Sequence, residues 1–199
     1  VKANQDKGFS IVSYEGTGAA ATVGHGLTSA PEMIILKNRS ITQNWRVAHI
    51  GLTNMSSYHI NLDATASQTN SGSLVWNNTA PTSSVFSIGT DSSVNGNGNN
   101  LIAYCFHSVA GYSKFDSYTG TGSAGNSVTG LGFQPAWLMI KETTSTGSWA
   151  IIDTTRSPNY NAQGEYLWAN LSSATGGASA PLTFDSDGFT INSGDSDTN

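Results

Sequence analysis

The stretch Tyr14-Glu-Gly-Thr-Gly18 returns as Tyr118-Thr-Gly-Thr-Gly122, 104 positions later in the chain. The same offset separates further anchors, namely Leu27 and Leu131, Pro31 and Pro135, Lys37 and Lys141, and Trp45 and Trp149. Matches at one unbroken offset that include Tyr, Pro and Trp are improbable by chance. The sequence therefore predicts a duplicated unit of about 104 residues, in which the repeated residues belong to the scaffold.

Apolar segments of the chain are short and rich in β-branched and aromatic residues, which is typical of strands. No stretch carries apolar residues at helical spacing without a Gly or a Ser/Thr/Asn cluster interrupting it, so we expect no substantial helix. The expected strands are residues 9–14, 32–37, 45–50, 58–62, 84–88, 101–106, 115–118, 136–141, 149–153, 165–168 and 188–191.

Turn-rich loops containing Gly and Asn, residues that tolerate positive φ, separate these strands. Many short strands with frequent turns predict an all-β protein, an antiparallel β-sandwich of jelly-roll or concanavalin-like type. We expect one pseudo-repeat over residues 1–110 and a second over residues 111–199. The sequence leaves open whether the two halves share a single core.

The repeat also predicts a missing element. Val94-Asn95 matches Thr198-Asn199 at the same offset, so the counterpart of the strand at residues 101–106 would come after Asn199. We expect the second repeat to lack its final strand and to leave an unpaired edge beside residues 188–191, which a longer polypeptide, a neighbour or another copy would cover.

Charged residues make up 11% of the 199 residues, and the net charge is −5. Eight Lys and Arg are too few for the basic stripe of a nucleic-acid-binding protein, so nucleic acid is not an expected partner. The single cysteine, Cys105, excludes an internal disulfide and reads as a core thiol. No apolar run approaches the roughly 20 residues that span a bilayer, and we expect no membrane insertion.

Aromatic residues divide into two groups. Those that recur in both halves are interpreted as core scaffold, namely Trp45, Trp149, Tyr14 and Tyr118. The alternative for the two tryptophans is a sugar-stacking platform. Aromatic residues in the less matched, loop-rich parts are the candidates for contact with a ligand or partner, namely Trp76, Tyr58, Tyr160, Tyr166 and Trp168.

Signals for metal binding or catalysis are weak. Asp185 and Asp187 resemble the first half of a calcium loop, but the later bidentate Glu is missing and a hairpin turn is the better interpretation. The histidines lack zinc-site spacing, and the chain has no G-x-S-x-G elbow and no evident pair of carboxylates. We therefore expect no metal, no cofactor and no catalytic residues.

Several long motifs resemble a poorly characterised β-sandwich domain of virion structural and tail-fibre-like proteins of marine tailed phages. They are Gly8-Phe-Ser-Ile-Val-Ser-Tyr-Glu-Gly-Thr-Gly18, Val23-Gly-His-Gly-Leu27, the segments 30–40, 81–89 and 102–115, Gly132-Phe-Gln-Pro-Ala-Trp-Leu-Met-Ile-Lys141, Ile152-Asp-Thr-Thr-Arg156 and Asp187-Gly-Phe189. The resemblance implies a virion location, a β-sandwich and a Tyr-rich strand after Asn199, and it supplies no catalytic residues.

Together these observations predict a non-enzymatic virion structural protein, exposed on the particle as a tail-fibre, appendage or capsid-decoration module that acts in assembly and adhesion to the host surface. Its expected partners are other virion proteins, further copies of this chain and a host-surface glycan. A weakly charged Ser/Thr/Asn/Gly surface suits such packing, because hydrogen bonds form across an interface without desolvating ions. The alternative is a carbohydrate-binding, lectin-like module, viral or secreted.

Overall fold

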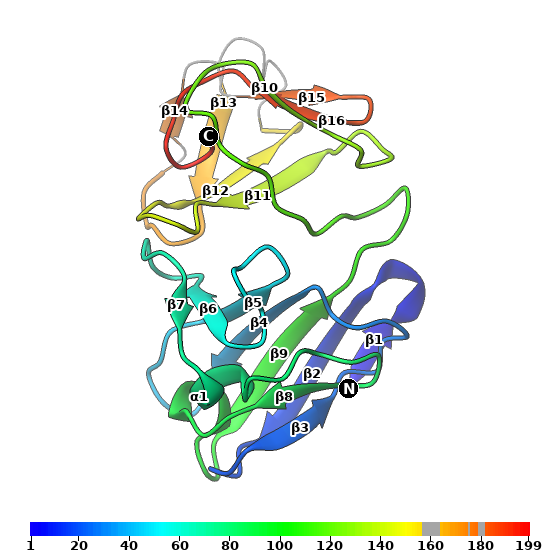
Figure 1. Cartoon of the computed structure of the whole chain (residues 1–199), viewed down its shortest axis with the longest axis vertical. Helices are drawn as coiled ribbons and strands as arrows, with labels where there is room; N and C mark the ends of the chain where they lie inside the picture. Colours follow the sequence, from blue (N-terminus) through cyan, green and yellow to red (C-terminus); the bar gives the residue numbers. More distant parts are fainter. Residues whose placement is uncertain (157–163, 175, 179–181) are drawn as a thin grey trace. The chain divides into compact units, whose positions relative to one another are not determined.

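A computed structural model describes residues 1–156, 164–174, 176–178 and 182–199 of the chain (Figure 1). The described residues form two compact units, unit 1 from residues 1–62 and 68–117 and unit 2 from residues 63–67 and 118–199. The boundary falls after Ser117 rather than after residue 110, because the Phe115 ring packs on Phe106 at 5.6 Å between centroids.

Within the described residues no helix is long and apolar enough to cross a membrane.

Unit 1 is built on a seven-stranded antiparallel sheet in the order β1-β2-β9-β4-β5-β6-β7. A separate two-stranded sheet pairs β3 with β8. Two helices of four residues each, α1 and α2, complete the fold. The bounds are β1 Lys2–Asn4, β2 Phe9–Glu15, β3 Ala21–Gly24, β4 Met33–Asn38, β5 Arg46–His49, β6 Tyr58–Asn61, β7 Thr69–Asn70, α1 Ser73–Trp76, β8 Val85–Ile88, α2 Ser92–Asn95 and β9 Asn100–Phe106, with a 3-10 turn at Gln5–Lys7.

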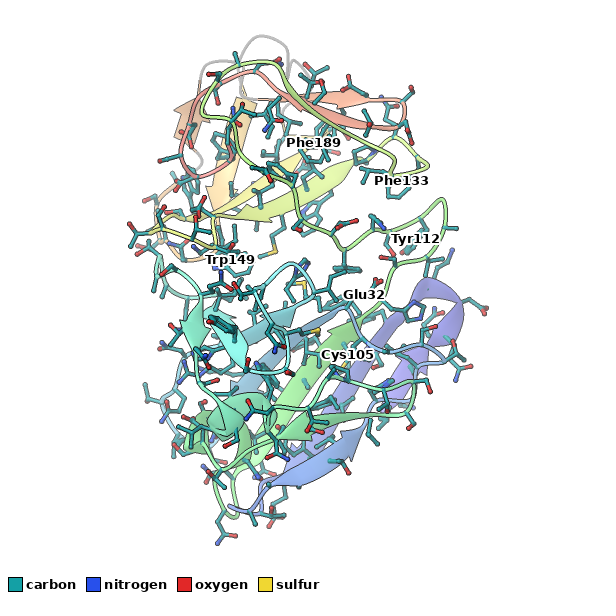
Figure 2. The ribbon with its side chains drawn as sticks, in the orientation of Figure 1. Glu32, Cys105, Tyr112, Phe133, Trp149 and Phe189 are labelled. Atoms are coloured by element: carbon teal, nitrogen blue, oxygen red, sulfur yellow. The ribbon has the colours of Figure 1, made fainter. Side chains whose placement is uncertain are left out.

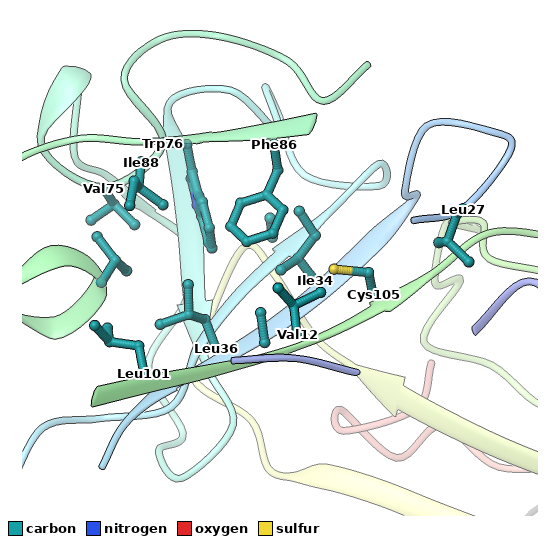
Figure 3. Packing of buried hydrophobic residues seen from close by; sticks show 13 residues of the cluster. Val12, Leu27, Ile34, Leu36, Val75, Trp76, Phe86, Ile88, Leu101 and Cys105 are labelled. Carbon is teal, nitrogen blue, oxygen red and sulfur yellow. The ribbon is translucent and has the colours of Figure 1, made fainter. Parts of the chain in front are cut away.

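The core of unit 1 lies between these two sheets (Figure 3). Strand β9 shows why its sequence forms a strand here: Leu101, Ala103 and Cys105 alternate along it and are each 0% exposed. Burial raises the pKa of the Cys105 thiol to about 12, as expected for a core cysteine. Trp76 of α1 and Phe86 of β8 close the core from the opposite side.

Unit 2 contains a four-stranded antiparallel sheet in the order β11-β12-β13-β14 and a three-stranded sheet in the order β10-β16-β15. Its core takes alternate residues from both sheets, including Ile140, Ile152, Phe184 and Ile191. The predicted all-β, antiparallel, sandwich-type fold is thus confirmed. The bounds are β10 Asn126–Thr129, β11 Trp137–Lys141, β12 Trp149–Asp153, β13 Gly164–Trp168, β14 Gly176–Ala178, β15 Leu182–Asp185 and β16 Gly188–Ile191.

The expected open edge beside residues 188–191 is wrong. Strand β16 pairs with β10 on one side and with β15 on the other. The reason is visible in unit 1, where the strand that matches β16, which is β8, pairs with β3 in a sheet that does not contain β9. A strand equivalent to β9 would therefore not lie beside β16.

A half-buried cation, Arg46, joins β5, β6 and α2 in unit 1. Arg46 Nε donates to Ser93 Oγ at 2.9 Å, and its Nη1 donates to Asn61 Oδ1 at 2.9 Å. The same Nη1 lies 2.9 Å from His59 Nε2, which must accept because a guanidinium can only donate. Burial first, and the Arg46 charge second, lower the pKa of His59 to about 4.

This pKa predicts a loss of stability in acid. An unfolded histidine takes up its proton near pH 6.5, whereas folded His59 stays neutral down to about pH 4. Stability from His59 is complete above pH 6.5 and is lost as the pH falls toward 4, by about 2–3 kcal/mol. Denaturant unfolding at pH 7 and pH 4.5 should show a smaller difference for His59→Gln than for the unmodified chain. Equal differences would contradict this role. His25 and His49 also have lowered pKa values, but both chains contain them, so their contributions to the pH dependence cancel in the comparison.

Candidate functional site: an aromatic groove on unit 1

Trp45 lies on the face of the seven-stranded sheet that is opposite the core. Ala48 of β5 is in the core and pairs with the core residue Ile34 of β4. Because side chains alternate along a strand, Trp45 belongs to the other face. Trp45 is half-buried there, so its interpretation as core scaffold is wrong.

Tyr104 of β9 shares this outer face with Trp45. Its register partner on β4 is Ile35, and the neighbouring pair on the same face is Lys37 with Ile102. The planes of the Trp45 and Tyr104 rings are within 24° of parallel, and their centroids are 6.5 Å apart. Two aromatic rings that lie 59 positions apart in the sequence are thereby brought together by the pairing of β9 with β4.

A shallow groove, wide open to solvent, runs along these rings and the loop that joins β4 to β5, and its volume of about 800 Å³ is that of an open surface depression. Trp45, Tyr104 and Ile102 contribute apolar surface, and Ser40 and Thr42 contribute hydroxyl groups.

The groove is cationic. Lys37 Nζ lies 5.6 Å from the centroid of the Trp45 ring and donates to the carbonyl of Gln43. Arg39, which is exposed, stands on the rim. None of the residues that line the groove is acidic. A ligand in it would therefore meet an aromatic surface and two positive charges.

The loop that forms the groove wall is held in place by Asn38, which is 1% exposed. Its Oδ1 accepts from the backbone N–H groups of Ser40 at 2.9 Å and Ile41 at 3.3 Å. Its Nδ2 donates to the carbonyl of Ser92 at 2.7 Å. Because a buried amide that loses its partners is costly, this network favours one loop conformation and a preformed groove.

Chemically, the groove suits a ligand that offers a flat or weakly polar face together with acceptor oxygens. Aromatic rings bind such faces by dispersion and burial, and a cation beside an aromatic ring remains able to bind an anionic group. A sugar ring that carries a carboxylate or sulfate has both features.

The aromatic residues predicted as contact sites are mostly placed elsewhere. Trp76 is 2% exposed in the core of unit 1, and Tyr166 is 1% exposed in the core of unit 2. Trp168 is partly buried against that second core, with its ring centroid 5.1 Å from that of Tyr166. The prediction of surface contact is therefore wrong for Trp76 and Tyr166.

Tyr58 and Tyr160 remain predicted contact residues. Tyr58 is half-buried on β6, where it pairs with Asn70 of β7 and contributes nothing to the groove. Tyr160 lies outside the described residues. Neither residue changes the placement of the candidate site.

Three of the four predicted scaffold residues occupy interior positions. Trp149, labelled in Figure 2, is 4% exposed. Tyr14 packs against the core of unit 1 and Tyr118 against the core of unit 2. Burial raises the pKa of both phenols above the usual value, so neither is suited to proton transfer near neutral pH.

Asp185 and Asp187 stand at the β15–β16 turn, where Asp185 pairs with Gly188. Asp187 accepts from the N–H groups of Gly130 at 3.0 Å and Gly132 at 2.7 Å, and Asp185 accepts from the Thr190 hydroxyl at 2.8 Å. Both carboxylates therefore accept hydrogen bonds that stabilise the turn and its neighbouring loop. Across the part of the chain that the structure describes, no group of three or more His, Cys, Asp or Glu could hold a metal ion.

Other carboxylates are likewise engaged in local bonds. Asp153 accepts from the backbone N–H groups of Thr155 and Arg156 and pairs with the Arg156 side chain at 2.6 Å. These bonds hold the pKa of Asp153 below its usual value. Glu142 accepts from Thr144 and Ser145 in the same way. Carboxylates bound so locally stabilise turns.

The fold and the groove define a two-unit, antiparallel all-β protein that carries a solvent-open aromatic and cationic groove on one sheet. The whole chain, residues 1–199, matches the family described as Domain of unknown function (DUF7483), and the chain belongs to that family. No curated protein and no solved structure matches it.

Proposed function

We propose that this chain is a non-enzymatic adhesion module of a phage virion that binds a surface glycan in the groove of unit 1. The observation that carries the binding role is the pairing of Trp45 with Tyr104 beside Lys37 in an open groove. The virion location, and assembly with other virion proteins and with copies of this chain, rest on the motifs that resemble tail-fibre-like proteins.

The local use of the carboxylates supports a non-enzymatic role. Glycoside hydrolysis needs two carboxyl groups facing each other across a cleft, at a separation of about 5–10 Å. The groove on unit 1 has no acidic lining residue, and Asp153 and Glu142 belong to unit 2. Binding without turnover is therefore the activity that best fits the groove.

Replacing Trp45 by alanine tests the proposal. On a glycan array that includes neutral, uronic-acid and sulfated glycans, we expect the unmodified chain to bind and Trp45→Ala to bind at least ~10-fold more weakly, since an aromatic anchor commonly contributes about 2 kcal/mol. Trp45 is half-buried on the outer face, so the unfolding midpoint should fall less than it would for a fully buried tryptophan.

Trp137→Ala is the matched control, because Trp137 is 54% exposed and belongs to unit 2. It should leave glycan binding unchanged. Loss of salt dependence in Lys37→Gln would identify the ligand as anionic. Failure of the unmodified chain to bind any glycan, or unchanged binding by Trp45→Ala, would refute the glycan role. Mass spectrometry of purified particles tests the virion location independently.

A further inference from the structure

The same hydrogen bonds recur in the two units at the 104-residue offset. Tyr14 Oη donates to the carbonyl of Val94 at 2.6 Å, and Tyr118 Oη donates to that of Thr198. Asn95 Oδ1 accepts from Thr17 N at 2.8 Å, and Asn199 Oδ1 accepts from Thr121 N at 2.8 Å. The Nδ2 groups of the two asparagines donate to the carbonyls of Ala19 and Ser123. Asn95 and Asn199 therefore occupy equivalent positions.

In unit 1 the chain leaves Asn95 and enters β9, which fills the space between β2 and β4. Strand β4 is consequently paired along both edges, with β5 and with β9. The three core residues of β9, Leu101, Ala103 and Cys105, are fully buried. On β4 they cover Ile34 and Leu36, which are each 0% exposed.

In unit 2 the strand equivalent to β4 is β11, and its sheet order places it at an edge. It pairs with β12, and among the described residues no strand pairs with its other edge. Leu138, the equivalent of Ile34, is half-buried. Ile140, the equivalent of Leu36, is 8% exposed. The core of unit 2 is thus less covered along this strand than the core of unit 1.

The edge of β11 also lacks the usual protection against pairing. Natural edge strands are commonly blocked by charges, prolines or bulges. Strand β11 reads Trp137-Leu-Met-Ile-Lys141, with no charge before its last residue and no proline. Trp137 at its beginning is 54% exposed. Such an apolar edge is suited to strand addition.

We propose that the free edge of β11 binds an extended polypeptide segment that follows the pattern of β9. The segment pairs antiparallel to β11 and directs aliphatic or small side chains toward the core at every second position. The register of β9 on β4 places Ala103 opposite Leu36 and Cys105 opposite Ile34. The segment therefore presents an alanine-sized residue opposite Ile140 and a cysteine-sized residue opposite Leu138.

A synthetic peptide with the sequence of residues 99–106, with lysines added at its ends for solubility, provides the test. Hydrogen exchange followed by mass spectrometry should show exchange at β11 slowed by ~10-fold or more when the peptide is added to the full chain, because new backbone hydrogen bonds protect the amides. The control peptide carries the changes Ala103→Pro and Cys105→Pro, which remove strand hydrogen bonds. It should give no protection.

A covalent version keeps the test decisive if the peptide aggregates. Residues 96–106 appended after Asn199 would reproduce the connection that unit 1 makes after Asn95. We expect this extended chain to unfold at a midpoint about 5 °C higher or more, and the extension with the two prolines to give no increase. Protection at β4 instead of β11, or equal effects of the two sequences, would overturn the proposal. Protection of β11 that rises with concentration of the unextended chain would assign the edge to a second copy and also overturn it.

Discussion

Replacing Trp76 by alanine is expected to lower the free energy of unfolding by about 3–5 kcal/mol, the range for truncating a buried aromatic residue. Trp76 ends α1, is 2% exposed and closes the core of unit 1 together with Val75, Phe86 and Ile88 (Figure 3). Its removal exposes a cavity that the surrounding strands cannot fill without moving. Urea unfolding followed by circular dichroism measures the change.

Trp137→Ala is the control of the same chemistry. Trp137 is 54% exposed, and exposed substitutions usually change stability by no more than about 0.5 kcal/mol. If Trp76→Ala were as stable as Trp137→Ala and instead lost glycan binding, Trp76 would be a contact residue and its place in the core would be refuted.

Replacing Asn95 by alanine is expected to destabilise the chain by about 2–4 kcal/mol, because it leaves buried backbone groups without partners. Asn95 is 0% exposed. Its Oδ1 accepts from Thr17 N, and its Nδ2 donates to the carbonyls of Ala19 at 2.6 Å and Gly89 at 2.8 Å. Denaturant unfolding at neutral pH gives the measurement.

Asn199→Ala provides the comparison within the same molecule. Asn199 makes the equivalent bonds, with Thr121 N, the carbonyl of Ser123 and the carbonyl of Ser193. It is half-buried, however, so water can replace part of what is lost and the expected cost is about 1 kcal/mol. Equal costs at the two positions would show that burial is not what distinguishes them. Asn95→Asp should be at least as destabilising as Asn95→Ala, because a carboxylate cannot donate to two carbonyls.

Much of the strand content was predictable from local pattern. The expected segments at residues 101–106 and 149–153 correspond to β9 and β12. Short polar strands such as β3 and β10 were missed, because their alternation includes few large apolar residues. Residues 115–118 were expected as a strand and form none. Their counterpart in unit 1 is part of β2, which pairs with β9. Among the described residues of unit 2, no strand is equivalent to β9.

The candidate site was less accessible to sequence reasoning. Strand β4 carries apolar residues at consecutive positions, Met33-Ile-Ile-Leu36, so a period of two cannot say which face is buried. Trp45 consequently could not be assigned to either face from the sequence. The pairing of Ile34 with Ala48 in the core settles it, by placing Trp45 on the opposite face beside Tyr104.

Local composition and spacing alone determined that this chain is all-β, that its cysteine is buried, and that residues recur at one constant offset, because alternation and turn residues act over a few positions. Tertiary structure decided which tryptophan is buried and which lines a groove, and that β11 lies at a sheet edge among the described residues. These depend on how distant strands pair and on which sheet each one joins. Trp76 and Trp45 are each flanked on one side by polar residues, Asn77-Asn78 and Gln43-Asn44 respectively. Only the pairing of β4, β5 and β9, with α1 placed over the core, separates their roles.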